Sequence, residues 1–260
     1  MSVKIIHHTI GEHKLPVMLI NLKKRSIISL PTQIGCAIGC TFCVSSQNEF
    51  QRNLRSEELI ELVNFGLKNI QHKDALVSFT GEGEPFLNLK NINTAMSELH
   101  TNPKISCFRL CTSGIRPNLF ESVLTFSKPV NLQVSLHSMD DEVRRTMIPK
   151  TKPTKDILSA LKQATDHFNE IAINYVLMKG VNDSDRDVDA LTDSIDPRWI
   201  VKFNPLIDDG GPHKPSSRTE IFLSALYNTG LNAIAFNSVG SKIGNGLYGQ
   251  LTHAKNNRIA

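Results

Sequence analysis

Three cysteines lie within eight residues of one another in the segment "PTQIGCAIGCTFCVSSQ" (31–47). They are Cys36, Cys40 and Cys43, and the whole chain of 260 residues has only five cysteines. Thiolates are the protein ligands of soft metal ions and of iron–sulfur clusters. Three protein ligands leave one position of a metal site open for a substrate, as they do in catalytic zinc sites. The segment therefore indicates a metal or cluster centre with an open position.

A structural zinc site and free core cysteines are the alternatives to a cluster. Structural zinc usually has a fourth ligand and cysteine pairs of the C-x2-C kind, and no second pair follows in this sequence. Cysteines that only fill a core are not expected in a loop that also contains Gly35 and Gly39. Spacing and context together favour the iron–sulfur cluster.

The chain alternates short β-rich runs with helical patterns. Six strands are expected at 26–30, 76–80, 108–112, 132–136, 172–177 and 200–204. Apolar residues at helical spacing predict helices at 55–69, 91–100, 119–126, 157–168 and 184–194. This order implies parallel strands joined by right-handed crossovers. The sequence therefore predicts an α/β fold, a partial (β/α)6 TIM-like barrel short of the eight units that would close it.

The two ends of the chain add smaller elements. Residues 1–25 predict a short β extension, a hairpin of "KIIHHT" against "VMLINL", before a core domain at 26–260. The histidines His7, His8 and His13 are irregularly spaced, which favours an exposed hairpin over a metal site. A last helix at 218–228 opens with "SRTE", the pattern of a capping box, and a last strand is expected at 233–237.

Polar motifs follow most of the expected strands. "GEGEP" follows the second strand, "SGI" the third, "HS" the fourth and "NP" the sixth, while the cysteine segment follows the first. In parallel α/β folds, catalytic groups gather at the carboxyl ends of the strands. We therefore expect these motifs to meet at one end of the barrel.

The composition restricts the partners only weakly. The net charge is +4, but the basic residues are scattered, so a phosphate-bearing partner is permitted without being indicated. No segment approaches the roughly 20 apolar residues that span a bilayer. The amino terminus lacks the apolar core of a secretory signal. We therefore expect a cytoplasmic protein with reduced thiols and no membrane partner.

The pattern Cys36-x3-Cys40-x-Phe42-Cys43 resembles the signature of radical S-adenosylmethionine (SAM) enzymes. The resemblance implies that the three thiolates hold a 4Fe–4S cluster whose fourth iron chelates the amino and carboxylate groups of SAM. It implies that one electron from the cluster cleaves SAM to methionine and a 5′-deoxyadenosyl radical, which abstracts a hydrogen atom from the substrate. An electron donor such as flavodoxin or ferredoxin would supply that electron.

A narrower resemblance extends from about residue 26 to residue 251. Eight blocks resemble, in order, the rRNA adenine methylases of the RlmN/Cfr type. They are "QIGCAIGCTFC", "RNLRSEELI", "GEGEPFLN", "CTSGIRP", "VSLHSMDDEVRRTMIP", "NYVLMKGVNDS", "KFNPLIDDGGPHKPSS" and "GQL".

This resemblance implies which residues contact SAM. They are Gly83, Glu84, Cys111, Ser135, Leu136, His137 and Asn204. Glu84 would meet the amino group of the methionine moiety, in a loop whose glycines let the backbone approach a ligand closely. Asn204 would lie on the ribose or adenine side, and Phe42 would pack near the adenine or in the core. Cys111 stands where the family usually has a serine. For it, as for Cys107, a buried structural thiol is the reading that we favour.

Two positions depart from the rRNA methylases. In that family a cysteine before "GQL" carries the methyl group, and a cysteine seven residues ahead of the triplet resolves a thioether crosslink. This sequence has Tyr248 and Ser29 at those positions. A phenol or a serine hydroxyl does not replace a thiolate nucleophile at neutral pH.

Three functions therefore remain open. The favoured one is a radical SAM enzyme that abstracts hydrogen without a methylcysteine intermediate, with Tyr248 lining the substrate pocket. Its substrate is a small molecule or a nucleic acid, and by ancestry a nucleotide or nucleic-acid base is the best candidate. The second is an RNA methylase with Cys107 or Cys111 as an unusual carrier. The third is a non-enzymatic iron–sulfur or RNA-binding remnant.

Overall fold

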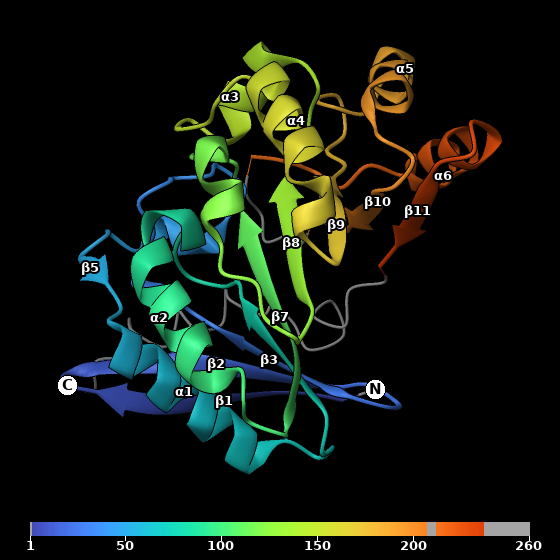
Figure 1. Ribbon diagram of the computed structural model, residues 1–260. Coiled ribbons are helices and arrows are strands. Elements are labelled where there is room, and N and C mark those ends of the chain that lie inside the picture. Colours follow the sequence, from blue (N-terminus) through green and yellow to red (C-terminus); the bar gives the residue numbers. More distant parts are fainter. Residues whose placement is uncertain (1, 207–211, 237–260) are drawn as a thin grey trace.

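The computed structural model describes residues 2–206 and 212–236, and one β-sheet organises this part of the chain (Figure 1). Its nine strands lie in the order β1-β2-β3-β6-β7-β8-β9-β10-β11. From β3 onward every strand is parallel to its neighbours on that side. These strands are β3 (Ser26–Leu30), β6 (Ala75–Phe79), β7 (Ile105–Thr112), β8 (Val130–Ser135), β9 (Glu170–Val176), β10 (Ile200–Asn204) and β11 (Asn232–Ala235).

The order of these strands in the sheet is their order in the sequence. A doubly wound sheet would instead reverse direction at a switch point. Within the described residues β1 and β11 are the two edges, so the barrel is partial. The predicted α/β fold with a mostly parallel sheet is confirmed, and the expected last strand is the parallel strand β11.

The amino-terminal hairpin continues the same sheet. Strands β1 (Ser2–Ile10) and β2 (His13–Asn21) pair antiparallel, and β2 also pairs antiparallel with β3. Gly11 takes the left-handed conformation in the turn between them, with φ of 59°. His8 lies 2.6 Å from a carboxylate oxygen of Glu61 on the neighbouring helix. Among the described residues, no three His, Cys, Asp or Glu side chains form a site for a single metal ion.

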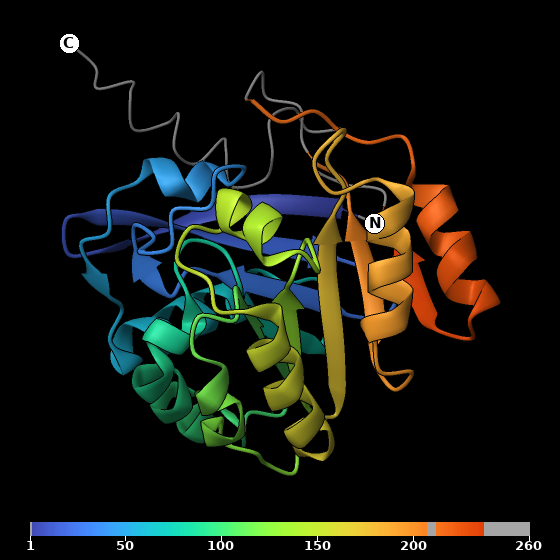
Figure 2. The same cartoon turned by 90° about the horizontal axis from the view of Figure 1, so that it is seen from above.

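Six α-helices are described, and Figure 2 shows most of them around the outside of the curved sheet. They are α1 (Ser56–Asn69), α2 (Leu89–Leu99), α3 (Asp141–Met147), α4 (Thr154–Gln163), α5 (Asp185–Ser194) and α6 (Thr219–Asn228). Within the described residues, none of them has the length and apolar character of a membrane span.

The helices of the structure differ from the expected ones in several places. The segment expected as a helix at 119–126 contains only the end of the 3-10 helix η3 (Pro117–Ser122). Helix α3 was not expected, although Asp140 caps it by accepting hydrogen bonds from the backbone N–H groups of Glu142 and Val143. The capping box at the start of α6 is wrong. Arg218 occupies the N-cap without a side-chain cap, and its N–H donates to Ser216 Oγ at 3.1 Å.

The two faces of the barrel strands differ in polarity. On β7, Phe108 and Leu110 belong to the main hydrophobic core, whereas Arg109 and Cys111 alternate with them on the other face. The same alternation runs from β3 to β10. It gives an inner face with Ser29, Ser78, Arg109, Cys111, Gln133, Ser135, Asn174, Lys202 and Asn204. Buried parallel strands are normally apolar on both faces, so a polar inner face is typical of a surface that contacts ligands.

Candidate functional site

The cysteine segment forms a loop beyond β3. The short strand β4 (Gln33–Ile34) pairs with β5 (Arg52–Asn53) and closes the base of this loop. Gly35 has φ of 74°, and a Cβ there would lie 1.9 Å from the backbone oxygen of Glu49. No other residue fits this position without moving the backbone. Cys36 N–H donates to the carbonyl of Asn48 at 3.3 Å, which holds the two sides of the loop together.

Glu82 of the "GEGEP" motif fastens this loop to the end of β6. Its Oε1 accepts the Gly35 N–H at 2.7 Å, and its Oε2 accepts from the side-chain amide of Asn48. Its backbone carbonyl accepts from Thr32 N–H at 2.9 Å. This role of Glu82 was not predicted, and the only signal for it in the sequence is the presence of two glutamates in the turn.

Glu84 is buried and joins the end of β6 to the end of β7. Its carboxylate accepts from Phe86 N–H at 3.0 Å, Thr112 Oγ1 at 2.6 Å, and Ser113 N–H and Oγ, both at 2.8 Å. Burial raises the pKa of this carboxyl, and the four donors oppose that rise. A carboxylate has about four acceptor sites, so these contacts use its capacity. The predicted contact with the SAM amino group would share or replace one of them.

The backbone at Gly83 is equally constrained. Its φ is 105°, and a Cβ there would lie 2.6 Å from Thr32 Oγ1 and 2.7 Å from Gln33 Cβ. Gln33 Oε1 accepts the N–H of Glu84 at 3.0 Å. The predicted pair Gly83 and Glu84 is therefore held directly against the strand that leads into the cysteine loop.

The three thiols lie half-buried within electrostatic reach of one another. Burial raises the pKa of Cys36, Cys40 and Cys43, and the other two thiols raise that of Cys40 further. In a 4Fe–4S cluster each protein thiolate binds a different iron, and three thiols on one loop supply three such ligands. The donor set fits the cluster.

A small apolar cluster surrounds the cysteine loop. It consists of Ile38, Met147, Ile148, Val176 and Met178, with Cys36, Cys40, Phe42, Leu87, Ile115, Val143, Val181 and Leu206 packed against it. Thr41 N–H donates to the carbonyl of Met147 at 2.9 Å, which attaches the loop to the end of α3. Apolar side chains thus cover part of the surface of Cys36 and Cys40.

His137 follows β8 in a strained backbone conformation. Its φ of 62° is positive, which is seen at no other non-glycine residue of the described chain. Its Nδ1 accepts the N–H of Val176 at 3.2 Å, and burial and the charge of Arg144 lower its pKa to about 3, so the ring is neutral. Phe42 packs edge-on against this ring, with centroids 5.0 Å apart. The predicted residues His137 and Phe42 therefore meet beside the cysteine loop.

The other residues predicted to contact SAM do not all lie on the same face of the sheet. Leu136 has its side chain in the hydrophobic core, so only its backbone faces the site. Ser135 is paired with Asn174 across β8 and β9. Asn174 Oδ1 accepts from Gln133 Nε2 at 2.7 Å and from Asn204 Nδ2 at 3.2 Å. The amides of three strands thus form a row on the inner face, and Asn174 at its centre was missed although strand alternation could have indicated it.

The two remaining cysteines, Cys107 and Cys111, are four residues apart on β7 and lie on the same face of that strand. Cys111 is on the inner face of β7, paired in register with Gln133, and burial raises the pKa of its thiol. Cys107 is buried near the start of the strand. Ser29 Oγ donates to the carbonyl of Thr80 at 2.9 Å. Tyr248 lies outside the described residues.

Arg144 is the largest feature that the sequence analysis missed. Its guanidinium is fully buried and donates to four carbonyls, those of Leu136 (2.8 Å), Lys152 (3.3 Å), Ser113 (2.6 Å) and Ser135 (2.9 Å). Desolvation lowers its pKa to about 10, so it stays charged at neutral pH. Its charge also lowers the pKa of Cys40. Arg144 therefore clamps the ends of β7 and β8 and places a positive charge close to the thiols.

The fold and the cysteine loop define a class of enzyme, and the comparisons with known proteins agree. Residues 30–191 match the model of the radical SAM superfamily. The chain belongs to this superfamily, whose enzymes use a 4Fe–4S cluster and SAM.

Its relatives include RNA methyltransferases. The probable dual-specificity RNA methyltransferase RlmN of Aquifex aeolicus (strain VF5) is 31% identical over 260 residues, which cover 93% of this chain and 74% of the relative. The dual-specificity RNA methyltransferase RlmN of Buchnera aphidicola subsp. Acyrthosiphon pisum (strain APS) is also 31% identical, over 94% of this chain and 71% of the relative. The resemblance to the RlmN/Cfr type is thereby confirmed.

The solved structures support the same fold. A radical SAM methyltransferase from Sphaerobacter thermophilus has a TM-score of 0.82 at 23% identity, and the match covers 95% of this chain and 80% of that one. Streptococcus suis SuiB bound to S-adenosylmethionine matches with a TM-score of 0.56 at 17% identity, over 82% of this chain and 52% of that one.

Proposed function

We propose that this radical SAM enzyme abstracts a hydrogen atom from a nucleotide or a nucleic-acid base without a methylcysteine intermediate. The observation that carries the proposal is that the chain has all three cysteines of the loop but has Ser29 at the position where the rRNA methylases have a cysteine. The Ser29 hydroxyl donates to the carbonyl of Thr80. A hydroxyl held in this way is a poor nucleophile at neutral pH.

The thiols outside the loop also favour this proposal. Burial raises the pKa of both Cys107 and Cys111, which lowers the fraction of thiolate at neutral pH. Methyl transfer from the sulfonium of SAM to a cysteine carrier needs that cysteine in its thiolate form. Cys111 nevertheless lies on the inner face, so an RNA methylase that uses Cys111 as its carrier is the second candidate.

The residues of the chain would bind and orient, while the cofactors supply the reactive species. When bound, the cluster and SAM supply one electron and the 5′-deoxyadenosyl radical. Cys36, Cys40 and Cys43 would hold the cluster, and Glu82 keeps their loop in place. The neutral ring of His137 and the amides of Asn174 and Asn204 offer hydrogen bonds without a change of charge.

The choice of a nucleotide or base rests on two observations. The relatives at about 30% identity are named as RNA methyltransferases. The inner face presents Gln133, Asn174 and Asn204, and amides both donate to and accept from the ring atoms of a heterocycle. An electron donor such as flavodoxin or ferredoxin, acting in the cytoplasm, would complete the system.

The decisive experiment is anaerobic incubation of the reconstituted protein with SAM, with and without dithionite. We expect 5′-deoxyadenosine and methionine to form only with the reductant, and S-adenosylhomocysteine to stay at background. A methyl-deuterated SAM should leave no label in a candidate nucleotide product. S-adenosylhomocysteine in amounts equal to 5′-deoxyadenosine would instead establish the methylase.

A further inference from the structure

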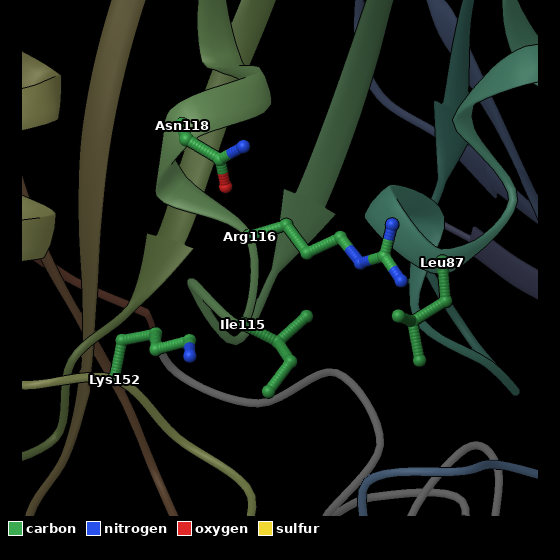
Figure 3. A pocket seen from close by; sticks show the side chains of 5 residues that line it. All are labelled: Leu87, Ile115, Arg116, Asn118 and Lys152. Carbon is green, nitrogen blue, oxygen red and sulfur yellow. The ribbon is translucent and has the colours of Figure 1, made fainter.

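A pocket of about 390 Å³ opens near the carboxyl ends of β6 and β7. It is lined by Leu87, Ile115, Arg116, Asn118 and Lys152 (Figure 3). In that view the Ile115 side chain lies between the ammonium of Lys152 and the guanidinium of Arg116, which extends toward Leu87. The pocket therefore combines an apolar floor with two cationic groups.

The charge of this pocket is not balanced by the residues that line it. None of the five lining residues is acidic. Some arginines of the described chain pair with carboxylates, for example Arg145 with Glu142 and Arg218 with Asp185, and others, such as Arg186, do not. The side chains of Arg116 and Lys152 have no ion pair or hydrogen bond within the described residues. Two uncompensated cations that face one concavity favour an anion there.

Hydrogen bonds hold the backbone segments that carry the two cations. The Arg144 guanidinium donates to the carbonyl of Ser113, two residues before Ile115, and to the carbonyl of Lys152. Lys150 Nζ donates to the carbonyl of Ala37 in the cysteine loop at 2.6 Å. The two cations are thus carried on backbone segments whose relative position is already set, which reduces the entropy lost on binding.

The pocket also adjoins the reactive centre. Leu87 and Ile115 pack against the same small apolar cluster against which Cys36 and Cys40 also pack. A group held by Arg116 and Lys152 would therefore place the rest of the same molecule next to the cysteine loop. This is the geometry of a subsite that positions a substrate by a part that does not react.

We propose that this pocket binds a phosphate group of the substrate. The planar guanidinium of Arg116 matches two phosphate oxygens, the ammonium of Lys152 adds a second positive charge, and Asn118 adds an amide donor. The apolar floor would contact the sugar or base beside the phosphate. The choice of a nucleotide rests on the proposed function, whereas the binding of the phosphate does not.

Equilibrium dialysis of the anaerobic holoprotein tests this site directly. The probes are adenosine, adenosine 5′-monophosphate and a six-nucleotide RNA. We expect the monophosphate or the RNA to bind at least about tenfold more tightly than adenosine, and whichever does so identifies the source of the phosphate. Arg116→Ala and Lys152→Ala should each weaken that binding about tenfold, the effect of one charge-assisted hydrogen bond, and leave adenosine unaffected.

The matched controls are Arg186→Ala and Lys155→Ala, since both residues are exposed on helices and do not line the pocket. They should bind all three probes as the unchanged protein does. Equal binding of adenosine and its monophosphate would overturn the proposal, as would equal losses in the control variants. Competitive displacement of the monophosphate by SAM would also overturn it, because the pocket would then belong to SAM. Absence of 5′-deoxyadenosine would contradict the proposed function and leave the phosphate site standing.

Discussion

At the scale of single residues, we expect substitutions in the cysteine triplet to have effects different from substitutions of the other two cysteines. Cys36→Ala, Cys40→Ala and Cys43→Ala should each abolish the cluster and all cleavage of SAM, because each removes one of three thiolate ligands. Iron and sulfide analysis should give about four of each per chain for the unchanged protein. Cys107→Ala is the control, since Cys107 is buried on β7 away from the loop, and it should keep its iron. Loss of the cluster in that variant would show that the ligand set is wrong.

His137 predicts a dependence of stability on pH. Its pKa is lowered to about 3 in the fold, against 6.5 for a free histidine, so between these values the unfolded chain binds a proton that the native chain does not. The free energy of unfolding should therefore fall as the pH drops below about 6.5, by up to about 1.4 kcal/mol per pH unit from this residue.

Urea unfolding at several pH values would measure that slope. His137→Asn is the matched variant, because asparagine tolerates the left-handed backbone conformation and has no proton to gain. For this variant the slope of the unfolding free energy against pH should be smaller by the contribution of one proton, about 1.4 kcal/mol per pH unit. Identical slopes in the two proteins would contradict the assignment of a buried neutral ring.

At the scale of elements, one buried arginine ties the ends of two strands to the segment after α3. Arg144→Met would leave the carbonyls of Ser113, Ser135, Leu136 and Lys152 without this donor, and should lower the free energy of unfolding by at least about 2 kcal/mol. Arg144→Lys should recover only part of that loss, because an ammonium cannot reproduce the guanidinium fork.

The neighbouring Arg145 supplies the control for this prediction. It is half-exposed and pairs with Glu142 one turn earlier on α3, so Arg145→Ala should cost no more than about 0.5 kcal/mol. Chemical unfolding of the three variants side by side gives the comparison. Equal losses for Arg144→Met and Arg145→Ala would show that the clamp does not stabilise the fold.

At the scale of the whole molecule, the proposed function combines radical SAM chemistry with Ser29 and Tyr248 at the two positions where the rRNA methylases have relay cysteines. We expect no S-methylcysteine after expression or after incubation with methyl-labelled SAM, because Ser29 and Tyr248 stand at the two relay positions and an unactivated hydroxyl is a weak nucleophile. Intact mass and peptide mapping would measure it, with the known RlmN of a relative as the positive control. A stable methyl label on Cys107 or Cys111 would favour the methylase with an unusual carrier.

The sequence by itself determined the features that depend on neighbours along the chain. The triplet Cys36, Cys40 and Cys43 lies within eight residues, so its spacing and the glycines beside it were enough to predict a cluster site. Strands β3 and β10 have the bounds that the apolar runs predicted. The alternation of core-facing and inner-facing residues depends only on neighbouring positions in the sequence. The parallel order of the sheet followed from the alternation of strands and helices.

Only the tertiary structure decided which distant polar groups meet. Glu82 reaches Gly35 across 47 residues, Arg144 reaches Ser113 across 31, and Asn204 reaches Asn174 across 30. None of these pairs has a local signature, since burial makes each hydrogen bond necessary only after the strand ends have been brought together. The same reason applies to Glu84. Its motif predicted that it faces a ligand, and in the structure its carboxylate accepts hydrogen bonds from Thr112 and Ser113 at the end of β7. The motif predicted a carboxylate that contacts SAM, which stays a prediction, and packing decided the partners of that carboxylate within the chain.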